Sequence, residues 1–140
     1  MSVSDEAYFL ENIVDVNKKV KNILVGTIFV PIVFIILTIA GLWIVPHSYS
    51  ISIFTYSTVV SLLYMFLLKK NANPFLMMYL GVIFSSMFVF LLSMDGVILI
   101  SISYSFPPFV ACLYYNKRLT RATTFVCFFL ASGMVESLMN

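Results

Sequence analysis

The residues best suited to chemistry in this chain are two cysteines and one histidine. A cysteine nucleophile needs a base within hydrogen-bond reach, and His47 is the single histidine. In the membrane topology predicted below, His47 and the pair Cys112 and Cys127 fall near opposite faces of the membrane, so they form no catalytic pair. These three residues are also too few for a four-ligand metal site. We therefore predict no enzymatic activity, no metal and no other cofactor.

A second polar feature is the segment SISYSFPPF, residues 101–109. Two adjacent prolines inside a helix remove backbone donors and clash with the preceding turn, so the helix should kink or break there. In lipid, the freed carbonyls need hydroxyls, neighbouring helices or water as partners. Two interpretations stay open: a structural kink, or a broken helix that forms an interface or a polar path. The residues of that candidate interface or path are Ser101, Ser103, Ser105, Pro107 and Pro108.

The composition indicates which solvent the chain faces. Of its 140 residues, 61% are hydrophobic and 10% are charged, whereas a soluble domain is about half apolar and about a quarter charged. A chain this short leaves much of its surface exposed even when folded, so the surplus apolar surface must face lipid. The first 22 residues carry four acidic side chains and no apolar core, which excludes a cleavable signal peptide. We predict an integral membrane protein whose first span remains as an anchor.

Five segments approach the ~20 apolar residues that cross a ~30 Å hydrocarbon layer. Four have full length, whereas Glu136 leaves only about 14 uncharged residues in the fifth after Ala122. Pro31, four residues after Thr27, predicts a kink in the first span. The short connections make consecutive helices antiparallel neighbours. The predicted fold class is all-α: a polytopic membrane helix bundle with about five transmembrane helices and an N-terminal amphipathic helix. The bundle domain covers residues 23–140, with spans at 23–45, 50–68, 75–94, 97–115 and 122–138.

The basic residues gather in three short clusters, all on one side of a five-span bundle. The opposite side, around His47, around Asp95 and after the fifth span, holds no lysine or arginine. Excess basic residues mark cytoplasmic segments, so the N-terminus is predicted in the cytoplasm and the C-terminus outside if the fifth segment spans. The residues predicted to anchor the chain at the membrane surface are Lys18, Lys19, Lys21, Lys69, Lys70, Lys117, Arg118 and Arg121.

Residues 1–22 are predicted to form a cytoplasmic amphipathic helix. Phe9, Ile13, Val16 and Val20 recur at helical spacing, with acidic residues before them and lysines after them. That order of charges suits the helix dipole and places the lysines next to anionic headgroups. The helix is expected to lie along the inner membrane surface, either as an anchor or as a binding site for a partner.

Small and aromatic residues suggest how the spans pack. Four pairs of small residues at a spacing of four allow close helix approach. They are Ser57 with Ser61, Gly81 with Ser85, Ser101 with Ser105, and Gly133 with Ser137. Aromatic residues near the predicted span ends indicate an interfacial belt. They are Trp43, Tyr49, Tyr79, Tyr114 and Tyr115.

In size, short loops and low charge, over its whole length, the chain resembles the small polytopic immunity and exclusion proteins of bacteria. That resemblance implies binding to a partner within the inner, or plasma, membrane. We predict a non-enzymatic protein that acts through protein–protein contacts, as a small subunit of a membrane assembly or as an immunity-type protein. The alternative is a small oligomeric transporter or channel subunit with its polar path near residues 101–108. Membrane lipid and a membrane protein, or further copies of the chain, are the expected partners; nucleic acid is not.

Overall fold

The computed structural model describes residues 3–42, 44–94, 104–114 and 116–139. These residues are all-α, with no strand among them, as predicted. The helices are α1 (Val3–Gly26), α2 (Phe29–Ile39), α3 (His47–Lys69), α4 (Pro74–Ser93), α6 (Phe106–Cys112) and α7 (Lys117–Met139).

Three helical segments of the described chain are apolar and long enough to cross a membrane. They are Ser4–Ile39, which joins α1 to α2, and the helices His47–Lys69 and Pro74–Ser93. The fourth predicted span, residues 97–115, is described only from residue 104 to residue 114, and this part contains the short α6. The fifth predicted span belongs to α7, which begins five residues earlier than predicted, at Lys117. The chain is thus consistent with an integral membrane protein, and α4 matches its predicted span most closely.

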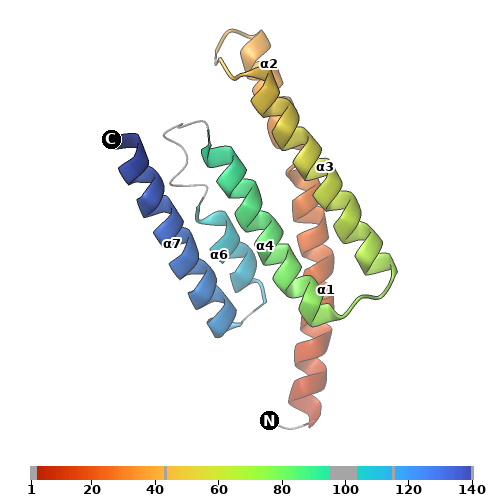
Figure 1. The fold of residues 1–140 in the computed structure, drawn as a ribbon. Helices are drawn as coiled ribbons and strands as arrows, with labels where there is room; N and C mark the ends of the chain where they lie inside the picture. The colour runs from red at the N-terminus through yellow and green to blue at the C-terminus, as the bar shows by residue number, and fades with distance from the viewer. Residues whose placement is uncertain (1–2, 43, 95–103, 115, 140) are drawn as a thin grey trace.

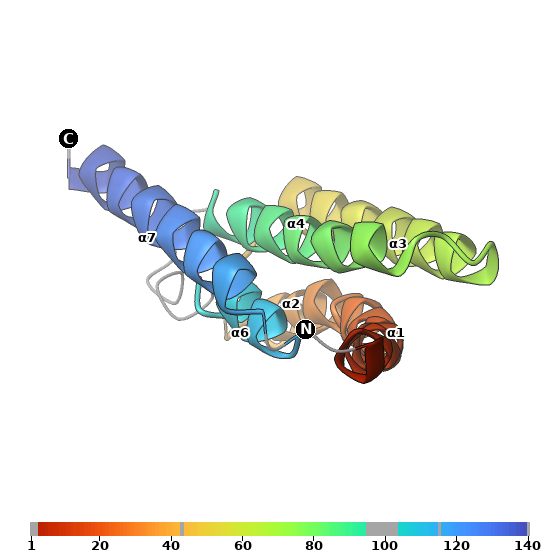
Figure 2. The same ribbon diagram turned by 90° about the horizontal axis from the view of Figure 1, so that it is seen from below.

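The helix α2 continues the direction of α1, and α3, α4, α6 and α7 then alternate in direction along the long axis of the molecule (Figure 1). Figure 2 shows α3 and α4 side by side in one layer, α1, α2 and α6 in a second layer, and α7 at one edge. The central helix is α4, which packs against α1, α3 and α6, whereas α7 packs mainly against α6. The main apolar core lies where α1, α3, α4 and the end of α6 meet.

The first predicted span is broken at Thr27 and Ile28, between α1 and α2. Pro31 explains the break, because it has no N–H to donate to the Thr27 carbonyl four residues earlier. The Thr27 carbonyl accepts from Val30 N instead, at 3.2 Å. The Leu24 carbonyl, at the end of α1, accepts from the Thr27 hydroxyl at 2.6 Å and from Ser61 Oγ of α3 at 2.9 Å. Hydroxyl groups therefore satisfy the backbone at the predicted kink.

The N-terminal helix differs from its prediction in extent and surroundings. It runs without interruption to Gly26, past the predicted domain limit at residue 22. Its apolar side, with Ile13, Val16, Val20 and Leu24 at most 3% exposed, packs against α3 and α4. We expected this apolar side to lie on a membrane surface, but the structure buries it in the main core. The physical reason is that α3 and α4 offer it a continuous apolar partner surface.

Small residues allow the close approach of α1 and α4. A Cβ at Gly81 would lie 2.9 Å from Val20 Cγ1, closer than side chains tolerate. Two of the four predicted small-residue pairs are buried at helix contacts, Ser57 with Ser61 and Gly81 with Ser85. Gly133 is exposed. Ser105 is also exposed, while Ser101 lies outside the described residues and the side chain of Ser137 is not described.

Candidate functional site

The predicted interface or polar path is only partly described. Ser101 and Ser103 lie outside the described residues, and the Ser105 side chain is exposed. Pro107 and Pro108 stand in the first turn of α6, where a backbone N–H has no helical acceptor to lose. The two prolines therefore start α6, and the earlier part of the predicted fourth helix, in which an interruption would show, lies outside the described residues.

Asn17 is a buried polar residue, 2% exposed, inside the main core. Its Oδ1 accepts a hydrogen bond from the Tyr114 hydroxyl at 2.6 Å and a longer one from the Tyr64 hydroxyl at 3.4 Å. Its Nδ2 donates to the Pro74 carbonyl at 3.1 Å, and Tyr64 also donates to the Met77 carbonyl at 3.2 Å. These bonds join α1, α3, α4 and the segment after α6.

The buried cluster of Asn17, Tyr64 and Tyr114 was not predicted from the sequence. Tyr114, predicted for the interfacial belt, is instead fully buried, and so is Tyr64. One signal was available, because Asn17 stands four residues after Ile13 and three before Val20 and so falls on the apolar side of its helix. Its oxygen and nitrogen are both paired within the protein, which indicates a structural junction rather than a site open to a ligand.

The residues with catalytic potential are separated. His47 begins α3 at one end of the bundle, and Cys112 ends α6 toward the other end (Figure 1). Cys112 is exposed, whereas Cys127 on α7 is buried, and both are free thiols. Within the described residues, no group of three or more His, Cys, Asp or Glu side chains is arranged to hold a metal ion.

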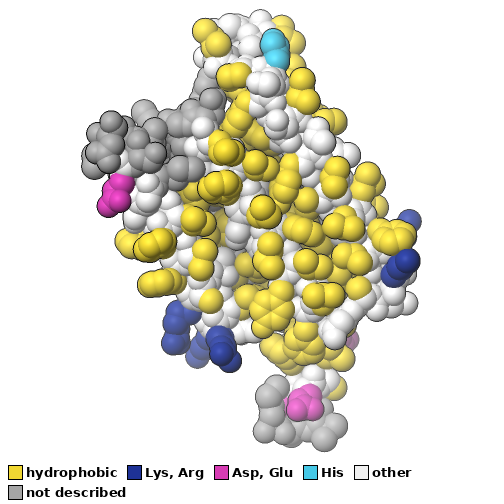
Figure 3. Space-filling model, in the orientation of Figure 1, with side chains coloured by type: hydrophobic (Ala, Val, Ile, Leu, Met, Phe, Trp, Pro, Cys, Tyr) yellow, Lys and Arg dark blue, Asp and Glu magenta, His cyan; other side chains and the backbone are white. Residues whose placement is uncertain are grey.

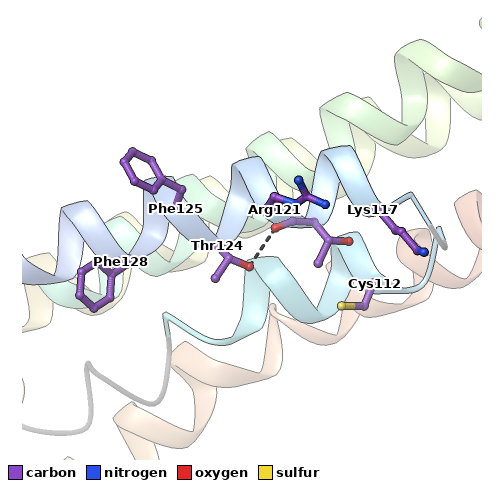
Figure 4. Close-up of a pocket in the computed structure, with 7 residues that line it drawn as sticks. Cys112, Lys117, Arg121, Thr124, Phe125 and Phe128 are labelled. Atoms are coloured by element: carbon purple, nitrogen blue, oxygen red, sulfur yellow. Dashed lines mark hydrogen bonds between the residues drawn. The ribbon is translucent and has the colours of Figure 1, made fainter.

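A large open groove with a volume of about 910 Å³ lies between α6 and α7. Cys112 lines it from α6, and α7 contributes the rest of the lining, namely Lys117, Thr120, Arg121, Thr124, Phe125 and Phe128. Figure 4 shows Thr124 and Phe128 on the side of α7 that faces α6, with Arg121 and Phe125 along its other edge. The Thr124 hydroxyl donates to the Thr120 carbonyl at 2.8 Å. We name this feature the α6–α7 groove.

Three basic residues stand at the start of α7, where the helix dipole is positive. Lys117, Arg118 and Arg121 are all exposed, and the first turn of α7 contains no acidic residue. Asn116 caps this end, since its Oδ1 accepts from the backbone N–H groups of Arg118 and Leu119 at 3.1 and 3.2 Å. Cations at a helix N-terminus oppose the dipole, so this end of the α6–α7 groove has a strongly positive potential.

The other predicted anchoring residues have different surroundings. Lys19 forms an ion pair with Asp15 at 2.9 Å, and Lys70 lies 4.5 Å from the ring centre of Phe66. Lys18, Lys21 and Lys69 line a smaller groove of about 480 Å³ between α1 and the end of α3. On the face shown in Figure 3, the Lys and Arg side chains lie at the lower left and at the right edge near mid-height, and the single histidine lies near the top.

Comparison with known protein families, with curated proteins and with solved structures finds no match to this chain.

Proposed function

We propose that this chain is a non-enzymatic integral membrane protein that acts by binding another protein within the membrane. A small subunit of a membrane assembly and an immunity-type protein both fit this description. The proposed location is a bacterial inner membrane, with the N-terminus in the cytoplasm and the C-terminus outside.

The observation that carries the proposal is the exposed aromatic surface that α7 leaves on the side away from α6. This helix packs mainly against α6, and it leaves an outer face of four exposed residues at helical spacing. The outer face of α7 consists of Ala122, Phe125, Phe129 and Ser132. Phe125 also borders the α6–α7 groove, and Ala122 also lines a hollow between α4 and α7. Phe125 and Phe129 are each 72% exposed. Aromatic residues are enriched where proteins meet, and small residues such as Ala122 and Ser132 favour close helix approach in membranes.

The buried polar groups support contact rather than conduction. Asn17, Tyr64 and Tyr114 bond to one another and to backbone, and Ser93 shares a hydrogen bond with Tyr104 at 3.0 Å. Polar side chains that satisfy one another in a packed core do not present a hydrated path. The transporter or channel alternative rests on Ser101 and its neighbours, and it requires several copies of the chain.

Site-specific photocrosslinking in native membranes tests the proposal. A photoreactive residue at position 129 should give a position-dependent, stoichiometric adduct with one different protein. The matched control is position 62 on α3, because Leu62 is similarly exposed, at 62%, but lies away from α7. Adducts with only a second copy of the chain, together with ion or solute flux in liposomes, would favour the channel alternative. No protein adduct at position 129 would refute the outer face of α7 as the contact.

A further inference from the structure

We propose that the α6–α7 groove binds one anionic phospholipid, with its phosphate at Lys117 and Arg121 and an acyl chain along Phe125 and Phe128. The inference rests on the proposed insertion of the bundle in a membrane, and it needs no protein partner. It assigns a defined lipid site to residues that the sequence indicated only as general surface anchors.

The order of side chains along α7 matches the order of groups in a phospholipid. Cationic and hydroxyl side chains alternate over the first two turns, as Lys117, Thr120, Arg121 and Thr124, and the aromatic rings of Phe125 and Phe128 come last. These positions fall on one side of the helix because they recur at spacings of three and four. Cations suit the phosphate, hydroxyls suit the ester region, and phenyl rings suit the hydrocarbon chain.

The dimensions of the groove agree with this occupant. From Lys117 to Phe128 the helix rises about 16 Å at ~1.5 Å per residue, close to half of a ~30 Å hydrocarbon layer. A lipid held there would therefore extend from its headgroup through one leaflet. The volume of about 910 Å³ lies at the upper end of the range typical of ligand pockets, ~300 to 1,000 Å³. The groove is open along one side, so a lipid could enter it laterally.

The charges of the groove favour an anionic headgroup over a zwitterionic one. No Asp or Glu is among the residues that line it. The positive end of the α7 dipole adds to the charge of Lys117 and Arg121, and no carboxylate of the described chain forms an ion pair with either of them. Near the smaller groove of Lys18 and Lys21, by contrast, Asp15 already pairs with the intervening Lys19.

The test is native mass spectrometry of the full chain in detergent, titrated with phosphatidylglycerol or with phosphatidylcholine of identical acyl chains. We expect one tightly retained phosphatidylglycerol, bound at least tenfold more tightly than phosphatidylcholine. The variant Lys117→Gln/Arg121→Gln should lose at least tenfold in that affinity. The matched control Lys69→Gln/Lys70→Gln removes the same charge elsewhere and should change it less than twofold. Thr124→Trp, which keeps both cations but fills the groove, should also abolish the retained lipid.

Several results would overturn the proposal. Equal affinity for phosphatidylglycerol and phosphatidylcholine would overturn it. An equal loss of phosphatidylglycerol affinity in Lys117→Gln/Arg121→Gln and Lys69→Gln/Lys70→Gln would also overturn it, because either result would indicate general attraction to the charged surface. Retention of the lipid by Thr124→Trp would show that it binds outside the groove. Far-UV circular dichroism of each variant confirms that the helices are intact. The measurement involves no partner protein, so its failure leaves the photocrosslinking result unaffected, and the reverse also holds.

Discussion

The hydrogen bond from Tyr114 to Asn17 joins positions far apart in the chain, and its removal is the sharpest test of the bundle described above. Replacing Asn17 by leucine leaves the buried Tyr114 hydroxyl without its 2.6 Å acceptor, whereas Tyr64 keeps the Met77 carbonyl. An unsatisfied buried polar group costs about 1 to 3 kcal/mol, so Asn17→Leu should lower the free energy of unfolding by that amount. Tyr114→Phe should also destabilise the protein. The double variant should lose less than the sum of the two single losses, because both polar groups are then gone.

The size of that coupling follows from the geometry. Hydrogen bonds between transmembrane helices contribute about 0.6 to 1.7 kcal/mol in double-mutant cycles, and the short Tyr114 bond should lie toward the upper end. The Asn17 and Tyr64 pair should couple more weakly, since its distance is 3.4 Å and Tyr64 has a second acceptor. Unfolding by SDS in mixed micelles, followed by far-UV circular dichroism, measures each variant. A different result is that the loss in the double variant equals the sum of the two single-variant losses to within about 0.3 kcal/mol. That result would show that Asn17 and Tyr114 are not coupled, and it would contradict the hydrogen bond between them.

Two further substitutions test the packing of the central helices with the same unfolding measurement. Gly81→Ala should cost about 1 to 3 kcal/mol by overpacking, because the new Cβ meets Val20 Cγ1 at 2.9 Å, and Val20→Ala should recover part of that loss. Gly133→Ala is the control, since it meets nothing within 4 Å and should be neutral or stabilising by up to about 1 kcal/mol. A stability of Gly81→Ala equal to wild type would contradict the close approach of α1 and α4. Ser57→Ala should be neutral or stabilising, because the buried Ser57 Oγ has no hydrogen-bond partner in the described structure. Ser61→Ala should instead lower the free energy of unfolding by about 0.6 kcal/mol, because it removes the hydrogen bond to the Leu24 carbonyl. If Ser57→Ala were less stable than Ser61→Ala, these hydrogen-bond assignments would be disproved.

The helices themselves could be predicted from local signals. Asn73 caps α4 through its side chain, which accepts from Phe75 N at 3.0 Å, and Pro74 occupies the first turn, as expected of a turn dipeptide that precedes a helix. The effect of Pro31 was also predictable, because a missing N–H acts within four residues of chain. The spans were predicted from composition and length, since apolar runs of about 20 residues have few alternatives to a membrane helix.

The contacts between helices were harder to predict from the sequence. Pro107 and Pro108 predict a disturbed helix, and a proline pair also fits the first turn of a helix, where α6 places it. The residues before Tyr104, which would show whether a longer helix is interrupted, lie outside the described residues. Periodicity also showed that α1 has an apolar side without showing what would cover it. Lipid and the surfaces of α3 and α4 are both apolar, so the sequence pattern is the same in either case.

The sequence by itself determined the all-α class, the approximate extents of α3 and α4 and the clustering of basic residues, because propensity, capping and apolar periodicity act within one or two turns of chain. The tertiary structure alone decided that Asn17 meets Tyr64 and Tyr114, and that the cations of α7 stand at one end of the α6–α7 groove. Those arrangements depend on which helices pack together and on how each helix is rotated about its own axis. Side chains distant in sequence set that rotation by packing together, and a single sequence does not display their pairing.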